Sequence, residues 1–107
     1  MTDAAIVVLT NLPDQESARI LARRLVEGRL AACVNIGASV ESIYHWHGQI
    51  ETGNEVPMAI KTRRVLYSKV EAAIRQIHPY ELPEVVALPI SDGSAAYLDW
   101  INAETRG

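Results

Sequence analysis

The order of the apolar segments constrains the fold of this chain more than any other feature of its sequence. Residues 6–9 form a continuous apolar run bounded by Asn11 and Pro13, which is typical of a strand buried on both faces. Residues 14–28 then carry apolar side chains at the spacing of a core-facing helix and end in glycine. A second apolar run at residues 31–36 completes a predicted β-α-β unit, in which a right-handed crossover joins parallel strands.

The next segment predicts a β-hairpin. Residues 40–47 alternate between two faces, and Gly48 together with residues 52–54 marks a turn region before a return strand at residues 56–62. Pro57 lies inside that return strand and cannot donate a backbone hydrogen bond. We therefore expect Pro57 at a sheet edge, a bulge or a subunit boundary.

The last third of the chain predicts another helix, a strand and a short final helix. Residues 66–77 have helical spacing and end at His78, and residues 85–90 form the next apolar strand. Residues 92–94 provide a turn and a helix cap before a short apolar stripe at positions 97, 100 and 101. The element order predicts an α+β, ferredoxin-like βαββαβ sandwich with an extended hairpin and an extra C-terminal helix. Residues 1–107 form one domain, because no repeat or linker divides them.

Two helices cannot cover both faces of the predicted sheet. The strands are apolar enough to leave a large hydrophobic surface on the second face, and such a surface usually marks an association site. The sequence therefore predicts a homo-oligomer in which sheets or extended hairpins pair between subunits, with residues 44–46 in the projecting arm.

Composition excludes several classes of protein. The formal net charge of -3 argues against sequence-independent nucleic-acid binding, which depends on a basic surface. The N-terminal apolar run at residues 4–9 is too short for a signal-peptide core or a membrane span. A single cysteine, Cys33, cannot form an intrachain disulfide, and its apolar neighbours favour a buried side chain. We therefore expect a cytoplasmic protein without a membrane or nucleic-acid partner.

The segment His78-Pro79-Tyr80-Glu81-Leu82-Pro83-Glu84 is the main candidate site, because its two prolines hold an imidazole, a phenol and two carboxylates in fixed directions. His78 and Glu84 could bind a divalent metal if another subunit or water completed the ligand set. A simpler explanation is that His78 interacts with the C-terminal end of its helix and that Glu84 caps or pairs locally. Tyr80 and Glu81 could line a cleft, or Tyr80 could pack on a neighbouring chain.

The predicted hairpin carries further candidates. His45 and His47 are two residues apart on a strand, which is a two-ligand geometry for zinc or copper, although an exposed polar face explains them more simply. Tyr44 and Trp46 on the opposite face favour packing between subunits over the stacking of a planar ligand.

Lys61 lies at the end of the return strand, where it could hold an anion in a subunit cleft or form an ion pair with Glu81 or Glu84. The sequence contains no Gly-rich phosphate loop, nucleophile elbow or His-Glu-x-x-His motif. We therefore expect a protein that is not an enzyme.

Five segments spread over nearly the whole chain carry a family resemblance. They are Leu30-Ala31-Ala32-Cys33-Val34-Asn35, Ser42-Ile43-Tyr44-His45-Trp46-His47-Gly48, Ile60-Lys61-Thr62, the segment from His78 to Glu84, and Tyr97-Leu98-Asp99-Trp100-Ile101. Together these segments resemble the CutA divalent-cation tolerance family. The resemblance implies a single CutA-like domain in a stable cytoplasmic homotrimer that is related to the PII signalling proteins and responds to divalent metal ions. It also implies clefts between subunits, for which the candidate lining residues are Cys33, Trp46, Lys61, Tyr80 and Glu81.

Copper binding in this family has been linked to a thiol after the first strand, together with the histidine and the second glutamate of the corner segment. His78 and Glu84 match the last two, whereas Thr10 stands at the thiol position. A hydroxyl is a poor Cu(I) ligand, but imidazole and carboxylate suit Cu(II), Zn or Ni. We expect no tightly bound cofactor and a possible divalent metal at His78 and Glu84.

Two other functions remain open. A PII-like sensing or scaffold module would hold an anionic metabolite beside Lys61 or dock a partner protein on its outer surface. A chiefly structural trimer is the third possibility.

Overall fold

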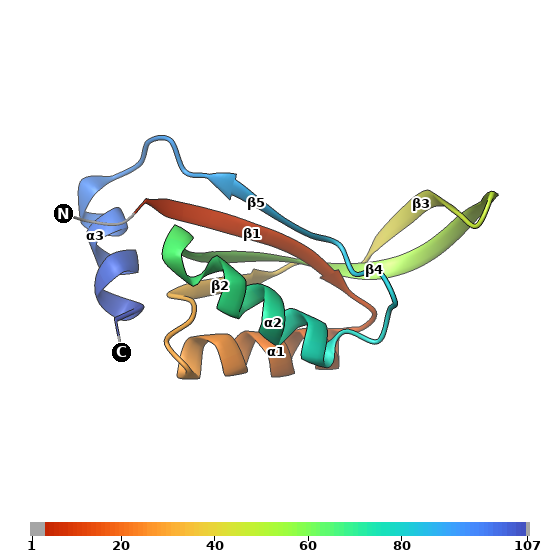
Figure 1. The fold of residues 1–107 in the computed structure, drawn as a ribbon, viewed down its shortest axis with the longest axis horizontal. Helices are drawn as coiled ribbons and strands as arrows, with labels where there is room; N and C mark the ends of the chain where they lie inside the picture. Colours follow the sequence, from red (N-terminus) through yellow and green to blue (C-terminus); the bar gives the residue numbers. More distant parts are fainter. Residues whose placement is uncertain (1–3, 107) are drawn as a thin grey trace.

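The computed structural model describes residues 4–106, which form a sheet with helices packed against it (Figure 1). In chain order the elements are β1 (Ala5–Leu12), α1 (Gln15–Glu27), β2 (Cys33–Ile36), β3 (Val40–Trp46), β4 (Gln49–Arg63), a 3-10 turn (Arg64–Leu66), α2 (Tyr67–Ile77), β5 (Val85–Pro89) and α3 (Ala95–Glu104). This order confirms the predicted βαββαβ arrangement with an additional C-terminal helix.

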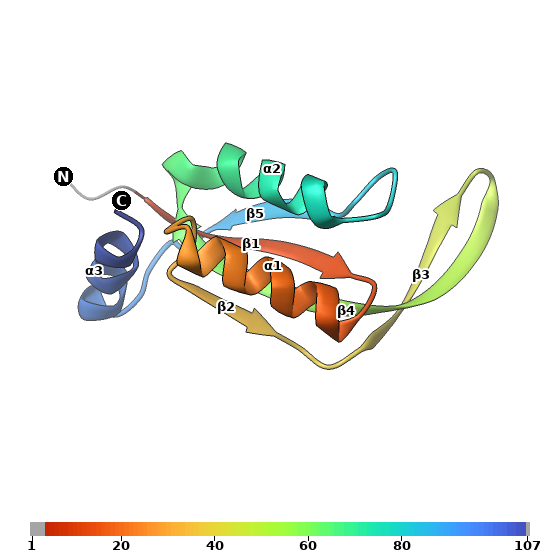
Figure 2. The ribbon, with the colours of Figure 1, turned by 90° about the horizontal axis from the view of Figure 1, so that it is seen from below.

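The main sheet has the strand order β2-β4-β1-β5, and each neighbouring pair is antiparallel. Because β1 and β2 both pair with β4, they run parallel to each other, as the predicted crossover requires. β3 pairs only with the outer half of β4, so the β3–β4 hairpin projects beyond the sheet. Figure 2 shows α1 and α2 side by side over one face of the sheet, with α3 at the end opposite the hairpin.

The hydrophobic core lies between the sheet and the two long helices. Alternate residues of β1 face this layer, and Val8 and Leu12 are buried there together with Ile60 of β4. The helices contribute the apolar residues that the sequence spacing predicted. These buried helix residues are Ala18, Leu21, Leu25, Val70, Ala73 and Ile74.

The other face of the sheet is largely open. Val7 and Leu9 point to this face and are only partly buried. The prediction that residues 6–9 form a strand buried on both faces is therefore wrong within this chain. The reason is that the chain supplies only one helical layer. α3 covers one end of the open face, where Ile101 packs against Ala5 and Ala32.

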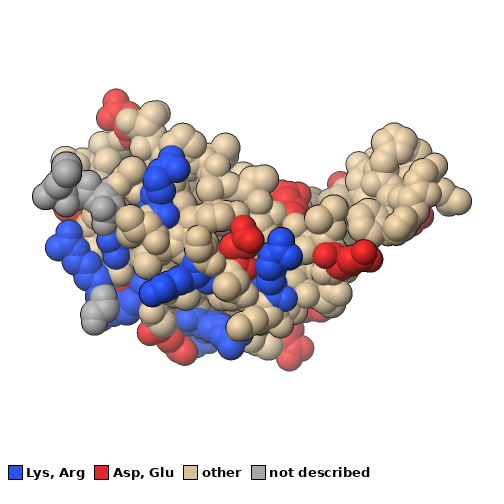
Figure 3. All heavy atoms as spheres, viewed as in Figure 1, with Lys and Arg blue, Asp and Glu red and all other residues tan. Residues whose placement is uncertain are grey.

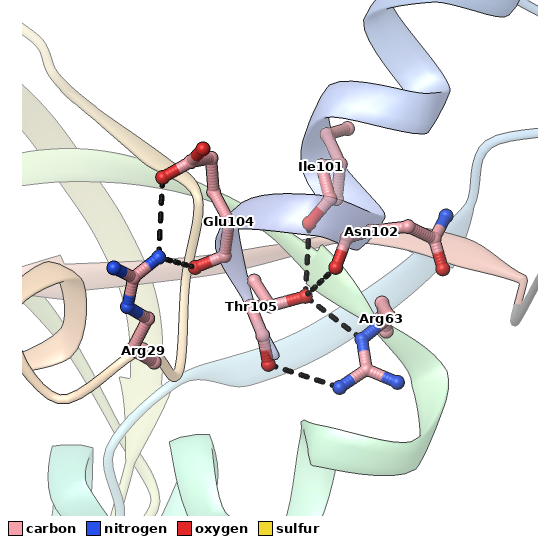
Figure 4. A network of polar contacts seen from close by, with 6 residues as sticks. All are labelled: Arg29, Arg63, Ile101, Asn102, Glu104 and Thr105. Atoms are coloured by element: carbon pink, nitrogen blue, oxygen red, sulfur yellow. Dashed lines mark hydrogen bonds and ion pairs between the residues drawn. The ribbon is translucent and has the colours of Figure 1, made fainter. Parts of the chain in front are cut away.

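Polar contacts attach α3 to the rest of the molecule (Figure 4). The Arg63 guanidinium of β4 donates from Nε to Thr105 Oγ1 at 2.8 Å and from Nη2 to the Thr105 carbonyl at 3.0 Å. Arg29, just after α1, donates to a carboxylate oxygen of Glu104 at 3.2 Å. The end of α3 is therefore tied to both the sheet and the helical layer.

The hairpin turns earlier than its glycine pattern suggested. His47 and Gly48 have positive φ angles of 50° and 77°, which is typical of a tight two-residue turn between paired strands. β4 therefore begins at Gln49, and residues 52–54 lie inside the strand rather than in the turn. Because His47 belongs to the turn, His45 and His47 do not lie together on one strand, so the two-ligand geometry, the less favoured of the two explanations, does not form.

Pro57 is accommodated where the pairing of β2 ends. The carbonyl of Pro57 accepts from the Gly37 N–H at 2.9 Å. Because the nitrogen and carbonyl of a strand residue point to the same side, the Pro57 nitrogen, which carries no hydrogen, also faces Gly37. The Gly37 carbonyl is satisfied by Gln15 Nε2 at 3.1 Å. Pro57 thus costs the sheet no hydrogen bond at this boundary.

Candidate functional site

The corner between α2 and β5 begins at His78. This residue has an extended ψ of 126° and donates its backbone N–H to the Ile74 carbonyl at 2.8 Å. Pro79 follows it and disfavours a helical conformation at His78, which ends α2 there as predicted.

His78 is buried, with 7% of the residue exposed, and its imidazole is bonded at both ring nitrogens. Nδ1 accepts from the Tyr80 backbone N–H at 3.2 Å, and Nε2 lies 2.6 Å from the Asn11 carbonyl. Since Nδ1 acts as the acceptor and a carbonyl can only accept, the hydrogen-bond pattern assigns the ring proton to Nε2. The Tyr80 ring packs edge-on against the imidazole, with centroids 4.6 Å apart.

Asn11 connects the two ends of the corner. Its backbone carbonyl contacts His78, and its Nδ2 donates to Glu84 Oε1 at 3.0 Å. The two metal-ligand candidates are therefore held by one residue at the end of β1. Sequence analysis missed Asn11, because only the folded sheet brings β1 beside the corner.

A groove of about 770 Å³ separates the corner from the β3–β4 hairpin. The hairpin register places Tyr44, Trp46 and Glu55 on one face, because Val40 pairs with Glu55 and Tyr44 with Glu51. Side chains of the corner line the other side. The lining residues are Ser42, Ile43, Tyr44, His45, Trp46, Glu55, Tyr80, Glu81, Leu82 and Glu84.

The groove unites six of the candidate residues, namely Tyr44, His45, Trp46, Tyr80, Glu81 and Glu84. Glu55 was missed, although a turn at His47-Gly48 would have placed it correctly by register. Burial raises the pKa of the Tyr80 phenol, and the negative charge of Glu55 adds to this effect. The groove is therefore an acidic environment, since Glu55, Glu81 and Glu84 all line it.

Cys33 and Lys61 lie elsewhere. They face each other across the β2–β4 pair on the open side of the sheet. Lys61 Nζ donates to Asn35 Oδ1 at 2.7 Å and lies 6.0 Å from the centre of the Tyr97 ring, so its partners are not the corner glutamates. Cys33 is partly exposed rather than buried, because the helical layer covers the opposite face.

Thr10 is buried in β1 and lies on the face toward the helices. Its Oγ1 has no hydrogen-bond partner within the described part of the chain. Among residues 4–106, no group of three or more His, Cys, Asp or Glu side chains is placed to hold a metal ion. A metal at His78 and Glu84 would therefore need ligands from another subunit or from water.

Comparison with known proteins gives a consistent result. The family model described as CutA1 divalent ion tolerance protein matches residues 6–104. The divalent-cation tolerance protein CutA of Thermus thermophilus is 44% identical over 92% of this chain and 96% of its own length. A solved structure of the Thermus thermophilus protein superimposes with a TM-score of 0.93 and covers 95% of this chain and 99% of that one.

Two further relatives carry names that refer to other compartments. The chloroplastic protein CutA of Arabidopsis thaliana is 41% identical over 98% of this chain, which spans 58% of that relative. The structure of the periplasmic divalent cation tolerance protein CutA from Archaeoglobus fulgidus is 35% identical, with a TM-score of 0.92 over 95% of this chain and 99% of that one.

No helix within residues 4–106 is both long and apolar enough to cross a bilayer. A cytoplasmic location stays a prediction, since the relatives include chloroplastic and periplasmic forms. The family match covers nearly all of the chain, and the fold agrees with it. The chain therefore belongs to the CutA1 divalent ion tolerance protein family.

Proposed function

We propose that this protein is a non-enzymatic homotrimer of the divalent metal-ion response that binds a metal ion in clefts between its subunits. Family membership supports the metal-ion response, because the relatives are named for tolerance to divalent cations. The observation that carries the site is the double contact of Asn11 with His78 and Glu84. This contact holds an imidazole and a carboxylate at the two ends of one rigid corner.

The bonding of His78 suits a metal ligand. Histidines that bind metals usually donate their other ring N–H to a carbonyl or carboxylate, and here Nε2 is held by the Asn11 carbonyl. The lone pair of Nδ1 would become available if the 3.2 Å contact from the Tyr80 N–H were released. With the exposed Glu84 carboxylate, this donor set suits Cu(II), Zn(II) or Ni(II).

Assembly into a homotrimer is supported by two exposed apolar surfaces. Val86 and Leu88 of β5 lie exposed on the open face of the sheet, and Ile43 and Ile50 are exposed on the projecting hairpin. Apolar area of this kind usually marks a subunit contact. A neighbouring subunit could then supply the ligands that this chain lacks.

Calorimetric titration of the intact protein with Cu(II), Zn(II) and Ni(II) tests the metal site. We expect binding tighter than millimolar in the wild type and its loss in the double variant His78→Ala with Glu84→Ala. Glu41→Gln is the matched control, because it removes a carboxylate of the hairpin that lies outside the groove lining. Unchanged binding in the double variant would rule out this site.

Lys61 favours a second function, the sensing of an anionic metabolite. Its ammonium group contacts the neutral Asn35 and forms none of the ion pairs described among residues 4–106. An anion at this position would raise the melting temperature, because it binds only the folded protein. Thermal-shift screening with nucleotides and organic acids should yield ligands whose effect disappears in Lys61→Ala, and retention of every shift would exclude the anion site.

A further inference from the structure

Positive charge is concentrated in the helical layer of this acidic protein. Residues 14–29 and 64–77, which include α1 and α2, carry seven lysines and arginines and four acidic residues, an excess of three positive charges. The rest of the chain carries three lysines and arginines and nine acidic residues. In Figure 3 the Lys and Arg side chains gather on the body of the molecule, and the projecting hairpin shows none on the face in view.

Ion pairs neutralise only part of this charge. Four exposed cations of the layer take part in none of the ion pairs described for residues 4–106. They are Arg19, Arg24, Arg64 and Lys69. Among the acidic residues of the layer, Glu27 and Glu71 already pair with arginines and Asp14 caps α1, which leaves Glu16. The layer therefore offers several uncompensated cations to a partner of opposite charge.

Exposed apolar side chains lie among these cations. Ile20 is 55% exposed and lies one helical turn before Arg23 and Arg24 on the exposed side of α1. Val65 is 61% exposed and follows Arg64 in the 3-10 turn before α2. Six of the seven cations of the layer are arginines, and protein interfaces are enriched in arginine and depleted in lysine. This composition therefore favours a protein partner.

The proposed trimer leaves this surface accessible. The surfaces that support assembly are the projecting hairpin and the open face of the sheet, whereas α1 and α2 cover the opposite face (Figure 2). The outward side of the two helices lies outside both contact surfaces. Each subunit of the assembled protein therefore presents one such surface.

The mixture of charges favours a peptide over a uniformly anionic partner. A lipid bilayer or a nucleic acid presents negative charge everywhere and would also face the exposed Glu16 and Glu27, whereas a peptide can place its carboxylates beside the arginines alone. A guanidinium group forms paired hydrogen bonds with a carboxylate, whereas an ammonium group acts as a hydrated point charge. Carboxylates are therefore the groups that match this surface.

We propose that the outward side of α1 and of the start of α2 docks an acidic segment of a partner protein. This two-helix surface consists of Arg19, Ile20, Arg23, Arg24, Arg64, Val65 and Lys69. Aspartate or glutamate side chains of the partner pair with the arginines, and an apolar residue between them contacts Ile20. The docking requires no metal ion and does not depend on His78.

Amide NMR signals of the intact, isotopically labelled protein test this docking. The probe is the peptide Ac-Glu-Glu-Leu-Glu-Glu-NH2, added in the presence of EDTA. We expect the signals of Ile20 and Val65 to shift with the peptide concentration and those of the hairpin to stay unchanged. The same peptide with glutamine in place of each glutamate should have no effect, because it keeps the leucine and loses the charges.

Substitutions of opposite charge lead to opposite expectations. Arg24→Gln should weaken peptide binding about twofold to fivefold, as expected for an exposed charge pair. Glu16→Gln removes the unpaired carboxylate one turn before Ile20 and should strengthen binding by a similar factor. Glu51→Gln is its matched control, because it removes the same charge from the hairpin near its turn and should leave binding unchanged. Light scattering checks that each variant keeps its mass.

The proposal is overturned if the Ile20 signal does not move at millimolar peptide, or if the glutamine peptide binds equally well. It is also overturned if Glu51→Gln strengthens binding as much as Glu16→Gln does, because total charge alone would then explain the result. Vesicles of phosphatidylglycerol that shift the Ile20 signal when the peptide does not would assign the surface to a membrane instead. EDTA and the independence from His78 separate these outcomes from failure of the metal site.

Discussion

Thr10 and Thr62 show how one residue type can have opposite effects at two buried positions. Both side chains are fully buried on the helix-facing side of the sheet. The Thr62 hydroxyl donates to the Leu30 carbonyl at 2.6 Å, whereas the Thr10 hydroxyl has no partner within the described residues. A buried polar group without a partner costs the folded state its lost hydration.

We therefore expect Thr10→Val to stabilise the protein, because it replaces an unsatisfied hydroxyl by a methyl group of similar shape. The free energy of unfolding in guanidinium should rise by about 1 kcal/mol. Thr62→Val is the matched control and should lower the free energy of unfolding by a similar amount, since it removes a bond and leaves the Leu30 carbonyl unpaired. A stability loss in Thr10→Val would show that its hydroxyl is satisfied in the assembled protein.

At the scale of single elements, α1 begins where the sequence predicted. The Asp14 carboxylate accepts from the Ser17 backbone N–H at 2.7 Å and caps the helix. This bond, followed by the Ser17 side chain, holds the pKa of Asp14 below its ordinary value of 3.8. A lowered pKa means that the charged form stabilises the fold, so its contribution is present above pH 3.8 and is lost as the pH falls through the folded-state pKa.

Comparison of Asp14→Asn with Asp14→Ala should separate the cap from its charge. Asparagine retains an acceptor at this position, so Asp14→Asn should unfold near the wild-type temperature at neutral pH, and Asp14→Ala should unfold at a lower temperature. Below pH 3.8 the wild type should lose stability relative to Asp14→Asn. A wild-type difference from Asp14→Asn that is independent of pH would contradict the assignment.

Gly37 is required by the end of the β2–β4 pair. A Cβ atom at this position would lie 3.0 Å from Cγ of the Pro57 ring, which the strand backbone holds in place. Gly37→Ala should therefore lower the free energy of unfolding by about 1–3 kcal/mol through overpacking. In Gly93→Ala the nearest atom, in Leu98, is 3.5 Å away, so chemical unfolding of this variant should match the wild type. Equal stability of both variants would mean that Pro57 can shift.

At the scale of the whole molecule, the sheet has one covered face and one face that is largely open. α1 and α2 cover one face, α3 covers one end of the other, and β5 leaves Leu88 49% exposed beside Val7. Ile20 on the outer surface of α1 is 55% exposed. Leu88 and Ile20 are therefore exposed to a similar extent, one on the open face of the sheet and one on the helical surface. Only the sheet face is extended and apolar.

If the subunits of the proposed trimer meet at the open face, Leu88→Lys should shift the protein to smaller species, because burying a charge between subunits is costly. Ile20→Lys places the same charge on the helical surface and should leave the proposed trimer intact. Multi-angle light scattering measures both masses, and circular dichroism checks that each variant is folded. A Leu88→Lys protein that remains trimeric would show that subunits do not meet at this face.

Much of the fold could be predicted from the sequence, because local signals repeat over many residues. The predicted helix of residues 14–28 has helical spacing and a terminal glycine, and the observed helix spans Gln15–Glu27. The hairpin was misplaced because Gly53 suggested a turn, although Gly53 lies within β4 across from Ser42 and near the Tyr44 hydroxyl. Glycine favours close packing as well as turns, and the sequence alone does not distinguish the two.

The sequence by itself determined the order of helices and strands, the family and the corner from His78 to Glu84, since each depends on local spacing or on motifs. The tertiary structure decided which side chains meet. Asn11 reaches both ends of the corner, Glu55 joins the aromatic groove, and Lys61 lies with Asn35 on the other side of the sheet. The physical reason is that strand register and sheet order bring together residues that are far apart in the chain, and no local pattern encodes those contacts.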